Sequence, residues 1–194
     1  MNDPYNKVTE AAAALRRAMS EANWTPEQEF TFHSQEQSRL CQENEWGDHT
    51  AYARTREIQA AGMLGHRVAL DYSGADAINQ KEEGVEYKST IAKNCKGRYS
   101  GLSVQPTWAQ QRQYLISEKI LPYPEHYFNR FENGVMVESW KLTGQQVYDI
   151  LLPKLERAYK RLSTNKDPRL SAAVCWTEIK NNGVQIIKNG KRVK

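Results

Sequence analysis

The sequence predicts a fold of the α/β or α+β class, in which helices flank a mixed central β-sheet. Segments whose apolar residues recur at helical spacing interleave along the chain with shorter segments in which apolar and polar residues alternate. The length of 194 residues suits one domain with a sizeable core, and no internal repeat or low-complexity stretch divides the chain. We therefore expect a single domain that covers residues 1–194.

Two helices are expected in the first third of the chain. The first covers about residues 8–22, where four apolar residues share one face: Val8, Ala12, Leu15 and Met19. This stripe can pack inside the molecule or mediate dimerisation, and the sequence does not separate the two. Residues 25–44 are polar and compatible with a helix that has no clear apolar face. The second helix is expected at about 48–64 and is closed by Gly65.

Strands are expected next, at residues 67–72, 76–79 and 85–90, and they form a meander. A further strand is expected at 102–107, with a polar face that contains Ser103, Gln105 and Thr107. A helix at about 108–118 follows, and then a hairpin at 128–140 that turns at Asn133-Gly134. A long helix comes next; it starts with a capping box of Thr143 and Gln146 and is kinked or interrupted at Pro153. The last element is a C-terminal hairpin of residues 172–179 and 184–188.

The segment 74–90 contains the residues with the clearest chemical potential. Glu86 and Lys88 share one face of the expected strand, whereas Tyr87 points away. A turn around residues 81–84 would bring Asp76 next to Glu86. Two carboxylates suit a hard ion such as Mg²⁺, and a neighbouring lysine can orient or deprotonate water and offset charge on a phosphate. The segment therefore predicts a phosphodiester-cleaving site.

The alternative is a solvated hairpin tip, in which Glu86 and Lys88 form a surface pair that contributes little. The neighbouring apolar residues argue against it, because they indicate a strand that is at least half buried: Val68, Leu70, Ile78, Val85 and Ile91. Such a strand has no structural need for a glutamate and a lysine on one face.

The order Asp76-Ala77, a polar turn with Gly84, and Glu86-x-Lys88-Ser89 resembles the motif of the PD-(D/E)XK nuclease superfamily, most closely that of PvuII-like type II restriction endonucleases. Ala75 stands where this motif usually has proline. The resemblance implies a restriction-endonuclease-like core and Mg²⁺-dependent hydrolysis of double-stranded DNA at a short palindromic sequence by a homodimer. Asp76 and Glu86 would bind Mg²⁺, with Mn²⁺ as a substitute, and Lys88 would activate water.

The resemblance also implies a division of labour along the chain, with a catalytic core at about 48–110 and recognition or supporting elements at about 93–188. In this superfamily, the helix before the motif often adds an acidic residue to the metal site, and Glu57 is the candidate. A salt bridge from Glu57 to Arg54 or Arg56 explains this residue equally well.

Sequence recognition is expected just after the motif, because the strands beyond the catalytic hairpin reach the major groove in PvuII-like enzymes. This segment is rich in side chains that bind phosphates or base edges: Lys93, Asn94, Lys96, Arg98, Ser103 and Gln105. The alternative is an edge strand whose polar residues prevent aggregation. The same triad also fits a structure-selective phage, repair or junction nuclease, or a non-catalytic DNA-binding protein in which the three residues meet by chance.

Composition agrees with an intracellular enzyme that acts on DNA. The net charge of +4 is modest, but acidic and basic residues are unevenly spread along the chain. Cys41, Cys95 and Cys175 form no CxxC pair, which favours a reducing cytoplasm over structural zinc. No apolar run approaches the length of a membrane span, so no membrane association is expected.

Overall fold

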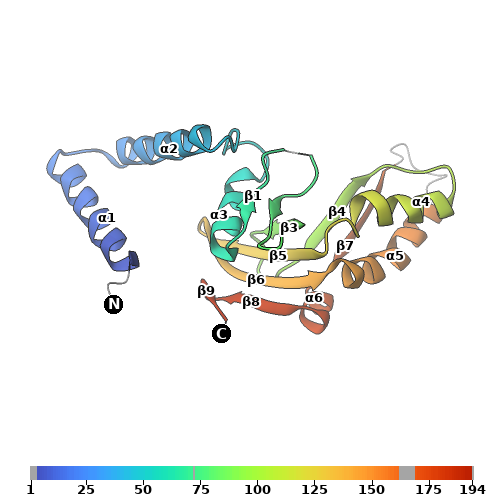
Figure 1. Ribbon diagram of the computed structural model, residues 1–194. Coiled ribbons are helices and arrows are strands. Elements are labelled where there is room, and N and C mark those ends of the chain that lie inside the picture. Colours follow the sequence, from blue (N-terminus) through green and yellow to red (C-terminus); the bar gives the residue numbers. More distant parts are fainter. Residues whose placement is uncertain (1–3, 72, 162–168, 194) are drawn as a thin grey trace. The chain divides into compact units, whose positions relative to one another are not determined.

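The computed structural model describes residues 4–71, 73–161 and 169–193 (Figure 1). The chain divides into two compact units, Met1–His49 and Thr50–Lys194, which are described separately. The prediction of one nuclease domain over residues 1–194 stays a prediction.

The first unit contains two helices, α1 (Pro4–Glu21) and α2 (Pro26–Glu43). Helix α1 confirms the helix predicted at 8–22 and begins four residues earlier. The polar segment before residue 44 is also helical, because Thr25 starts it with a capping box. The Thr25 hydroxyl accepts the Gln28 N–H at 3.3 Å, and the Gln28 side chain accepts the Thr25 N–H at 2.8 Å.

The second unit is a mixed α/β structure around a curled seven-stranded sheet. Its strand order is β1-β2-β3-β5-β6-β8-β9, and β3 and β5 are its one parallel pair in the part of the chain that the structure describes. The strands are β1 (Arg67–Val68), β2 (Ala77–Ile78), β3 (Gly84–Thr90), β5 (Glu125–Glu132), β6 (Val135–Thr143), β8 (Val184–Lys188) and β9 (Lys191–Arg192). Two further strands, β4 (Gly97–Leu102) and β7 (Leu170–Val174), form a separate antiparallel pair.

Helices cover both faces of the large sheet. Helix α3 (Arg54–Leu64) packs with Val85, Tyr87 and Phe131 on one face. On the other face, Phe128 and Leu142 pack with the long helix α5 (Gly144–Lys160), with the β4–β7 pair and with the short helix α6 (Trp176–Asn182). The connection from β4 to β5 contains α4 (Trp108–Tyr114), which continues as the π-helix η1 (Leu115–Lys119). Successive residues of β3 therefore point into two different environments.

Several sequence signals are confirmed where local chemistry decides the backbone. Gly65 ends α3 in the left-handed conformation, with a φ of 70°. The β5–β6 hairpin turns at Asn133 and Gly134, whose φ angles of 48° and 79° are both positive. The capping box of Thr143 and Gln146 starts α5, which remains one helix through Pro153.

The strand predicted at 102–107 is wrong, because the strand is β4 and ends at Leu102. Thr107 instead forms a capping box with Gln110 and starts α4, so the polar residues before it belong to a connecting segment. Other boundaries differ from the prediction as well: for example, α3 starts at Arg54, and β1 contains only Arg67 and Val68.

The predicted C-terminal hairpin of residues 172–179 and 184–188 is also wrong. Strand β7 pairs with β4, and β8 pairs with β6. The Asn181-Asn182-Gly183 turn signal lies instead at the end of α6. This helix starts directly after β7 because the Glu178 carboxylate accepts the Cys175 N–H at 2.8 Å. Ile179 then points into the core.

Gly97 allows β4 to approach β3 closely. A Cβ atom at this position would lie 2.8 Å from the Lys88 Cβ and even nearer to the Phe128 ring. Gly97→Ala should therefore lower the melting temperature in thermal unfolding by several degrees, as overpacking by about 1–3 kcal/mol does. Gly62→Ala is the control, because Gly62 lies inside α3 with no atom within 4 Å. Its melting temperature should rise slightly. Equal melting temperatures for the two variants would contradict the close packing.

Candidate active site

Strands β2 and β3 bring Asp76 and Glu86 together. Ala77 is opposite Val85 in this antiparallel pair, so the preceding residue, Asp76, falls opposite Glu86. The Asp76 N–H donates to the Val85 carbonyl at 3.0 Å, and its carboxylate accepts the Tyr87 N–H at 2.6 Å. Backbone pairing therefore places the carboxylate of Asp76 at the edge of β3.

Glu86 and Lys88 lie on the same face of β3 and form an ion pair. Their side chains are only 14% and 22% exposed, so this pair is not the solvated hairpin tip that the sequence left open as an alternative. Tyr87 points to the opposite face, where its hydroxyl lies 2.7 Å from His66 Nδ1. The alternation predicted for residues 86–88 is confirmed.

Burial and the charge of Glu86 raise the pKa of Asp76 to about 7. The Tyr87 N–H and the Lys88 ammonium oppose this rise, whereas Glu57 adds to it. Two carboxylates that repel each other at a partly buried position are stabilised when a divalent cation binds between them. The residues present therefore fit Mg²⁺, which characteristically binds one or two carboxylates and keeps several waters or phosphate oxygens.

Glu57 on α3 forms the salt bridge that the sequence offered as the alternative role for it. Its carboxylate lies 3.3 Å from the guanidinium of Arg54. Arg54 is 1% exposed and also donates to the Ala69 carbonyl at 2.6 Å. The described ranges contain no group of three or more His, Cys, Asp or Glu side chains that could hold a metal ion. A direct role for Glu57 in the site stays a prediction.

A cavity of about 440 Å³ opens in front of Glu86 and Lys88. Strand β4 contributes Arg98 to its wall, and η1 contributes Lys119. Lys119 makes no ion pair with any residue that the structure describes, and its ammonium lies 5.6 Å from the centre of the Tyr114 ring. The remaining lining residues are Gly74, Tyr99, Ser100, Leu102, Ser117, Glu118, Pro122 and Tyr123. The cavity wall therefore combines the Glu86–Lys88 ion pair with two further cations, Arg98 and Lys119.

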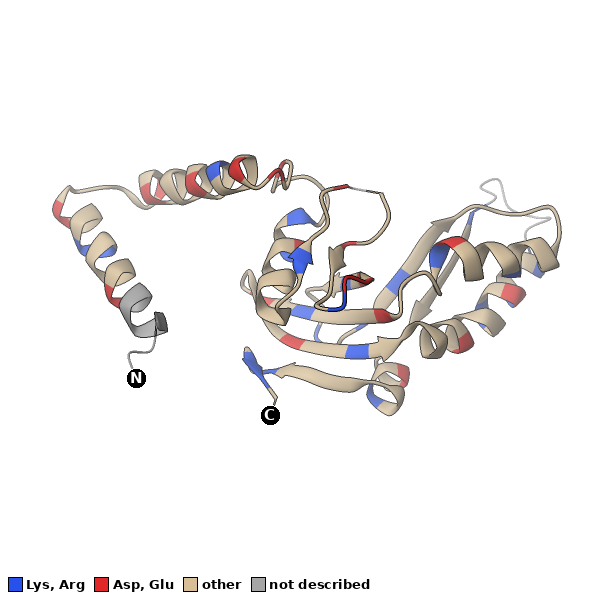
Figure 2. Cartoon of the chain, viewed as in Figure 1, with Lys and Arg blue, Asp and Glu red and all other residues tan. Residues whose placement is uncertain are grey.

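The structure separates the six predicted DNA-binding residues into two groups. Arg98 lines the cavity from β4, where it also donates to Ser171 Oγ at 3.3 Å. The other five do not line it: Lys93, Asn94, Lys96, Ser103 and Gln105. The first three are exposed between β3 and β4, and the last two follow β4. Figure 2 shows the acidic and basic residues of the chain in colour; the sequence of β3 contains Glu86 and Lys88, and that of β4 contains one basic residue, Arg98.

Sequence reasoning missed Lys119 because the residues around it contain no signal that predicts the π-helix η1. In this π-helix, the Ile120 N–H donates to the Leu115 carbonyl at 2.9 Å, five residues back. Leu115 and Ile120, the two residues that this hydrogen bond joins, are fully buried, and Lys119 between them is exposed. The apolar spacing alone is indistinguishable from that of an α-helix.

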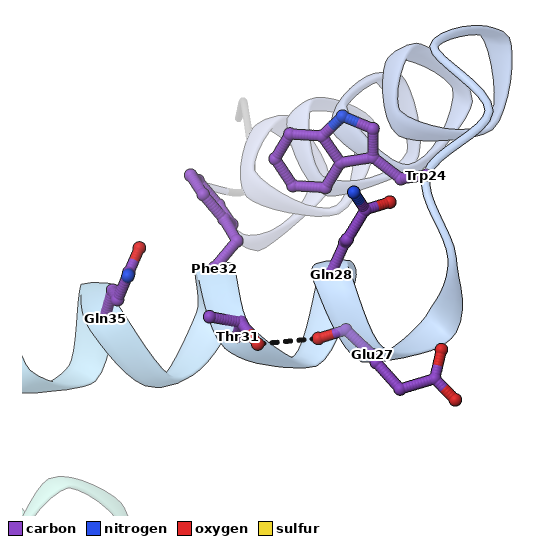
Figure 3. A pocket seen from close by; sticks show the side chains of 6 residues that line it. All are labelled: Trp24, Glu27, Gln28, Thr31, Phe32 and Gln35. Atoms are coloured by element: carbon purple, nitrogen blue, oxygen red, sulfur yellow. Dashed lines mark hydrogen bonds between the residues drawn. The ribbon is translucent and has the colours of Figure 1, made fainter.

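A second hollow of about 380 Å³ lies within the first unit (Figure 3). Trp24 and Phe32 pack edge to face in its wall, with ring centres 5.8 Å apart. The other lining residues are Glu27, Gln28, Thr31 and Gln35. Glu27 is its one ionisable group, so this hollow lacks the paired charges that distinguish the cavity at β3.

No protein-family model matches the chain, and no curated protein matches its sequence. No helix in the described ranges is long and apolar enough to cross a membrane. The function must therefore be inferred from the residues at β2, β3 and β4 themselves.

The raised pKa of Asp76 predicts a pH-dependent stability of the metal-free protein. Between pH 3.8, the ordinary pKa, and about 7, the folded state holds a proton that the unfolded state has lost, so the free energy of unfolding falls as pH rises. Asp76→Asn removes this charge and keeps the acceptor for the Tyr87 N–H. Its melting temperature in chelator should exceed that of the wild type by several degrees at pH 8, and the difference should shrink toward pH 4.

Asp149→Asn on the exposed side of α5 is the matched control and should leave the pH profile of the melting temperature unchanged. A constant difference between Asp76→Asn and the wild type from pH 4 to pH 8 would contradict a buried, repelled carboxylate.

Proposed function

We propose that the chain is a type II restriction endonuclease that hydrolyses phosphodiester bonds in double-stranded DNA with Mg²⁺, or Mn²⁺ as a substitute. The observation that carries this proposal is the meeting of Asp76, Glu86 and Lys88 at one partly buried point beside an open cavity. The spacing of these residues resembles the PD-(D/E)XK motif, and the mixed sheet with α3 behind the β2–β3 hairpin is compatible with a restriction-endonuclease-like core.

Each side chain has its own task in the proposed hydrolysis. Asp76 and Glu86 would hold the cation, which supplies an activated water and stabilises charge on the phosphate when bound. Lys88, next to Glu86, would orient the water for in-line attack and donate to a phosphate oxygen. Attack on the phosphorus would leave a 5′-phosphate and a 3′-hydroxyl.

The cavity would receive the DNA backbone through its cations. Arg98 and Lys119 line it together with the Glu86–Lys88 pair and would contact phosphates near the cut bond. Lys93 and Lys96 are exposed and would extend this contact, whereas Asn94, Ser103 and Gln105 remain candidates for base contacts. Duplex DNA is thus the proposed partner.

A short palindromic site calls for a two-fold protein, because each strand needs its own active site. We therefore propose a homodimer. The first unit supports this, because it exposes large apolar side chains on α1, on α2 and in the turn between them: Leu15 41%, Trp24 39%, Phe30 75% and Leu40 44%. A second copy of the chain would bury them.

A structure-selective nuclease with the same chemistry is the second candidate, because the triad would cut phosphodiesters whether the protein recognises the sequence or the shape of its substrate. A DNA-binding protein without catalysis is the third. Incubating plasmid DNA with the purified chain and Mg²⁺ separates the three: discrete fragments support a restriction enzyme, a smear or shape-dependent cutting supports the second, and intact but bound DNA supports the third.

Asp76→Ala, Glu86→Ala and Lys88→Ala should each reduce cleavage by at least about a thousandfold, because losing a metal ligand or a water-orienting group costs several kcal/mol in the transition state. In these variants, binding to duplex DNA should remain measurable in Ca²⁺, a cation that should support binding without cleavage. Chelation of Mg²⁺ should abolish cleavage by the wild type. Lys81→Ala, in the exposed turn between β2 and β3, is the control and should cut normally. Near-normal cutting by any of the three site variants would overturn the assignment.

Lys119→Ala should weaken binding to cognate and scrambled duplexes alike, because the lysine would contact phosphate. The slope of log K against log salt should fall by about one unit. Binding is measured in Ca²⁺ at several salt concentrations, so that nothing is cut. Lys180→Ala on α6 is the control, since Lys180 is exposed away from the cavity lining. An unchanged salt slope for Lys119→Ala would remove this lysine from the DNA-binding surface.

A further inference from the structure

Lys88 has a second neighbour besides Glu86, and this neighbour comes from the separate two-stranded sheet. Its ammonium lies 4.9 Å from the centre of the Tyr99 ring on β4. A cation at this distance is attracted by the negative face of the ring. Tyr99 thus contacts the part of the lysine that would carry out its chemical task.

Tyr99 is itself held firmly. It is 5% exposed, and its hydroxyl lies 2.9 Å from His126 Nδ1. His126 is fully buried on β5, and its Nε2 lies 3.0 Å from the Ile120 carbonyl. A carbonyl only accepts, so Nε2 carries the hydrogen, and Nδ1 accepts the proton of the Tyr99 hydroxyl. Burial lowers the pKa of His126 to about 4, which keeps the imidazole in this neutral form.

The stem of Lys88 is also held by β4. Gly97 lies two residues before Tyr99 and approaches the Lys88 Cβ so closely that no side chain fits between them. Strand β4 therefore contacts the lysine at both ends, with Gly97 at its Cβ and Tyr99 at its ammonium. A lysine side chain is flexible by nature, and these two contacts restrict where its charge can lie.

We propose that Tyr99 is a positioning residue for Lys88: its ring, fixed through His126 and the Ile120 carbonyl, holds the ammonium beside Glu86 at the wall of the cavity. This inference rests on the proposed nuclease function for its kinetic consequence. The position of the ammonium itself does not depend on that function and can be measured separately.

The test compares Tyr99→Phe, which keeps the ring, with Tyr99→Leu, which removes it. In single-turnover cleavage of duplex DNA with Mg²⁺, the leucine variant should be about 3- to 30-fold slower. The phenylalanine variant keeps the ring but loses the bond to His126, so its rate should fall between those of the leucine variant and the wild type. The affinity for duplex DNA in Ca²⁺ should change much less than the rate in either variant, because Tyr99 acts through Lys88 in the cleavage step.

Tyr159→Leu is the matched control for a loss of core packing. Tyr159 packs against the same core as Tyr99, and its hydroxyl donates to the Gln105 carbonyl at 2.9 Å. Its variant should unfold at a lower temperature but cleave at the wild-type rate well below that temperature. Equal slowing by Tyr159→Leu and Tyr99→Leu would overturn a specific effect on the lysine.

A readout independent of cleavage is the NMR signal of the Lys88 ε-methylene group, assigned through its loss in Lys88→Arg. The ring should shift this signal upfield in the wild type and in Tyr99→Phe, and the shift should disappear in Tyr99→Leu. An unshifted signal in the wild type would overturn the proposal. A shifted signal in a wild-type protein that does not cut DNA would contradict the nuclease function and keep the position assigned to Lys88.

Discussion

Strands β3 and β5 run parallel, and this pairing determines the path that the chain takes around the Glu86–Lys88 face. Parallel neighbours cannot be joined by a tight turn, so the chain between Thr90 and Glu125 must cross one face of the sheet. That crossover contains β4, α4 and η1. It lies over the face on which Glu86 and Lys88 point, and it supplies Arg98, Tyr99 and Lys119 to the same cavity.

The opposite face of β3 has a different role. Val85 and Tyr87 pack there with α3, and His66 bonds the Tyr87 hydroxyl. Because this side is apolar and well packed, the strand is held in one register, and a slip by one residue would exchange the charged face for the apolar one. The stability of the α3 side thus maintains the position of the carboxylates on the other side. Charges that repel each other in the metal-free state are kept together by packing behind them.

The elements that local chemistry decides could be predicted from the sequence. Gly65, the Asn133-Gly134 turn and the Thr143 capping box each act over four residues or fewer, and the structure has all three where they were expected. The alternation that puts Glu86 and Lys88 on one face is equally local. The strand predicted at residues 102–107 is wrong although its apolar and polar residues do alternate. The capping box at Thr107 starts α4 at the end of this segment, and β4 ends at Leu102. The pairing of β4 with β7 joins residues about seventy positions apart, and no local signal specifies it. For the same reason, Tyr99 and Lys119 entered the site only with the tertiary structure.

The π-helix η1 sets a limit on how this chain tolerates changes in length. A π-turn contains one residue more than the α-turn it replaces, so α4 and Ile120 are related by a rotation that an α-helix would not give. Deleting one residue between Leu115 and Lys119 would restore α-helical bonding but turn everything before it by about 100° relative to everything after it. Either Leu115 or Ile120, both fully buried, would then leave the core. Substitutions can accumulate on the outer side of η1, but its number of residues is fixed by the two hydrophobic anchors that it connects.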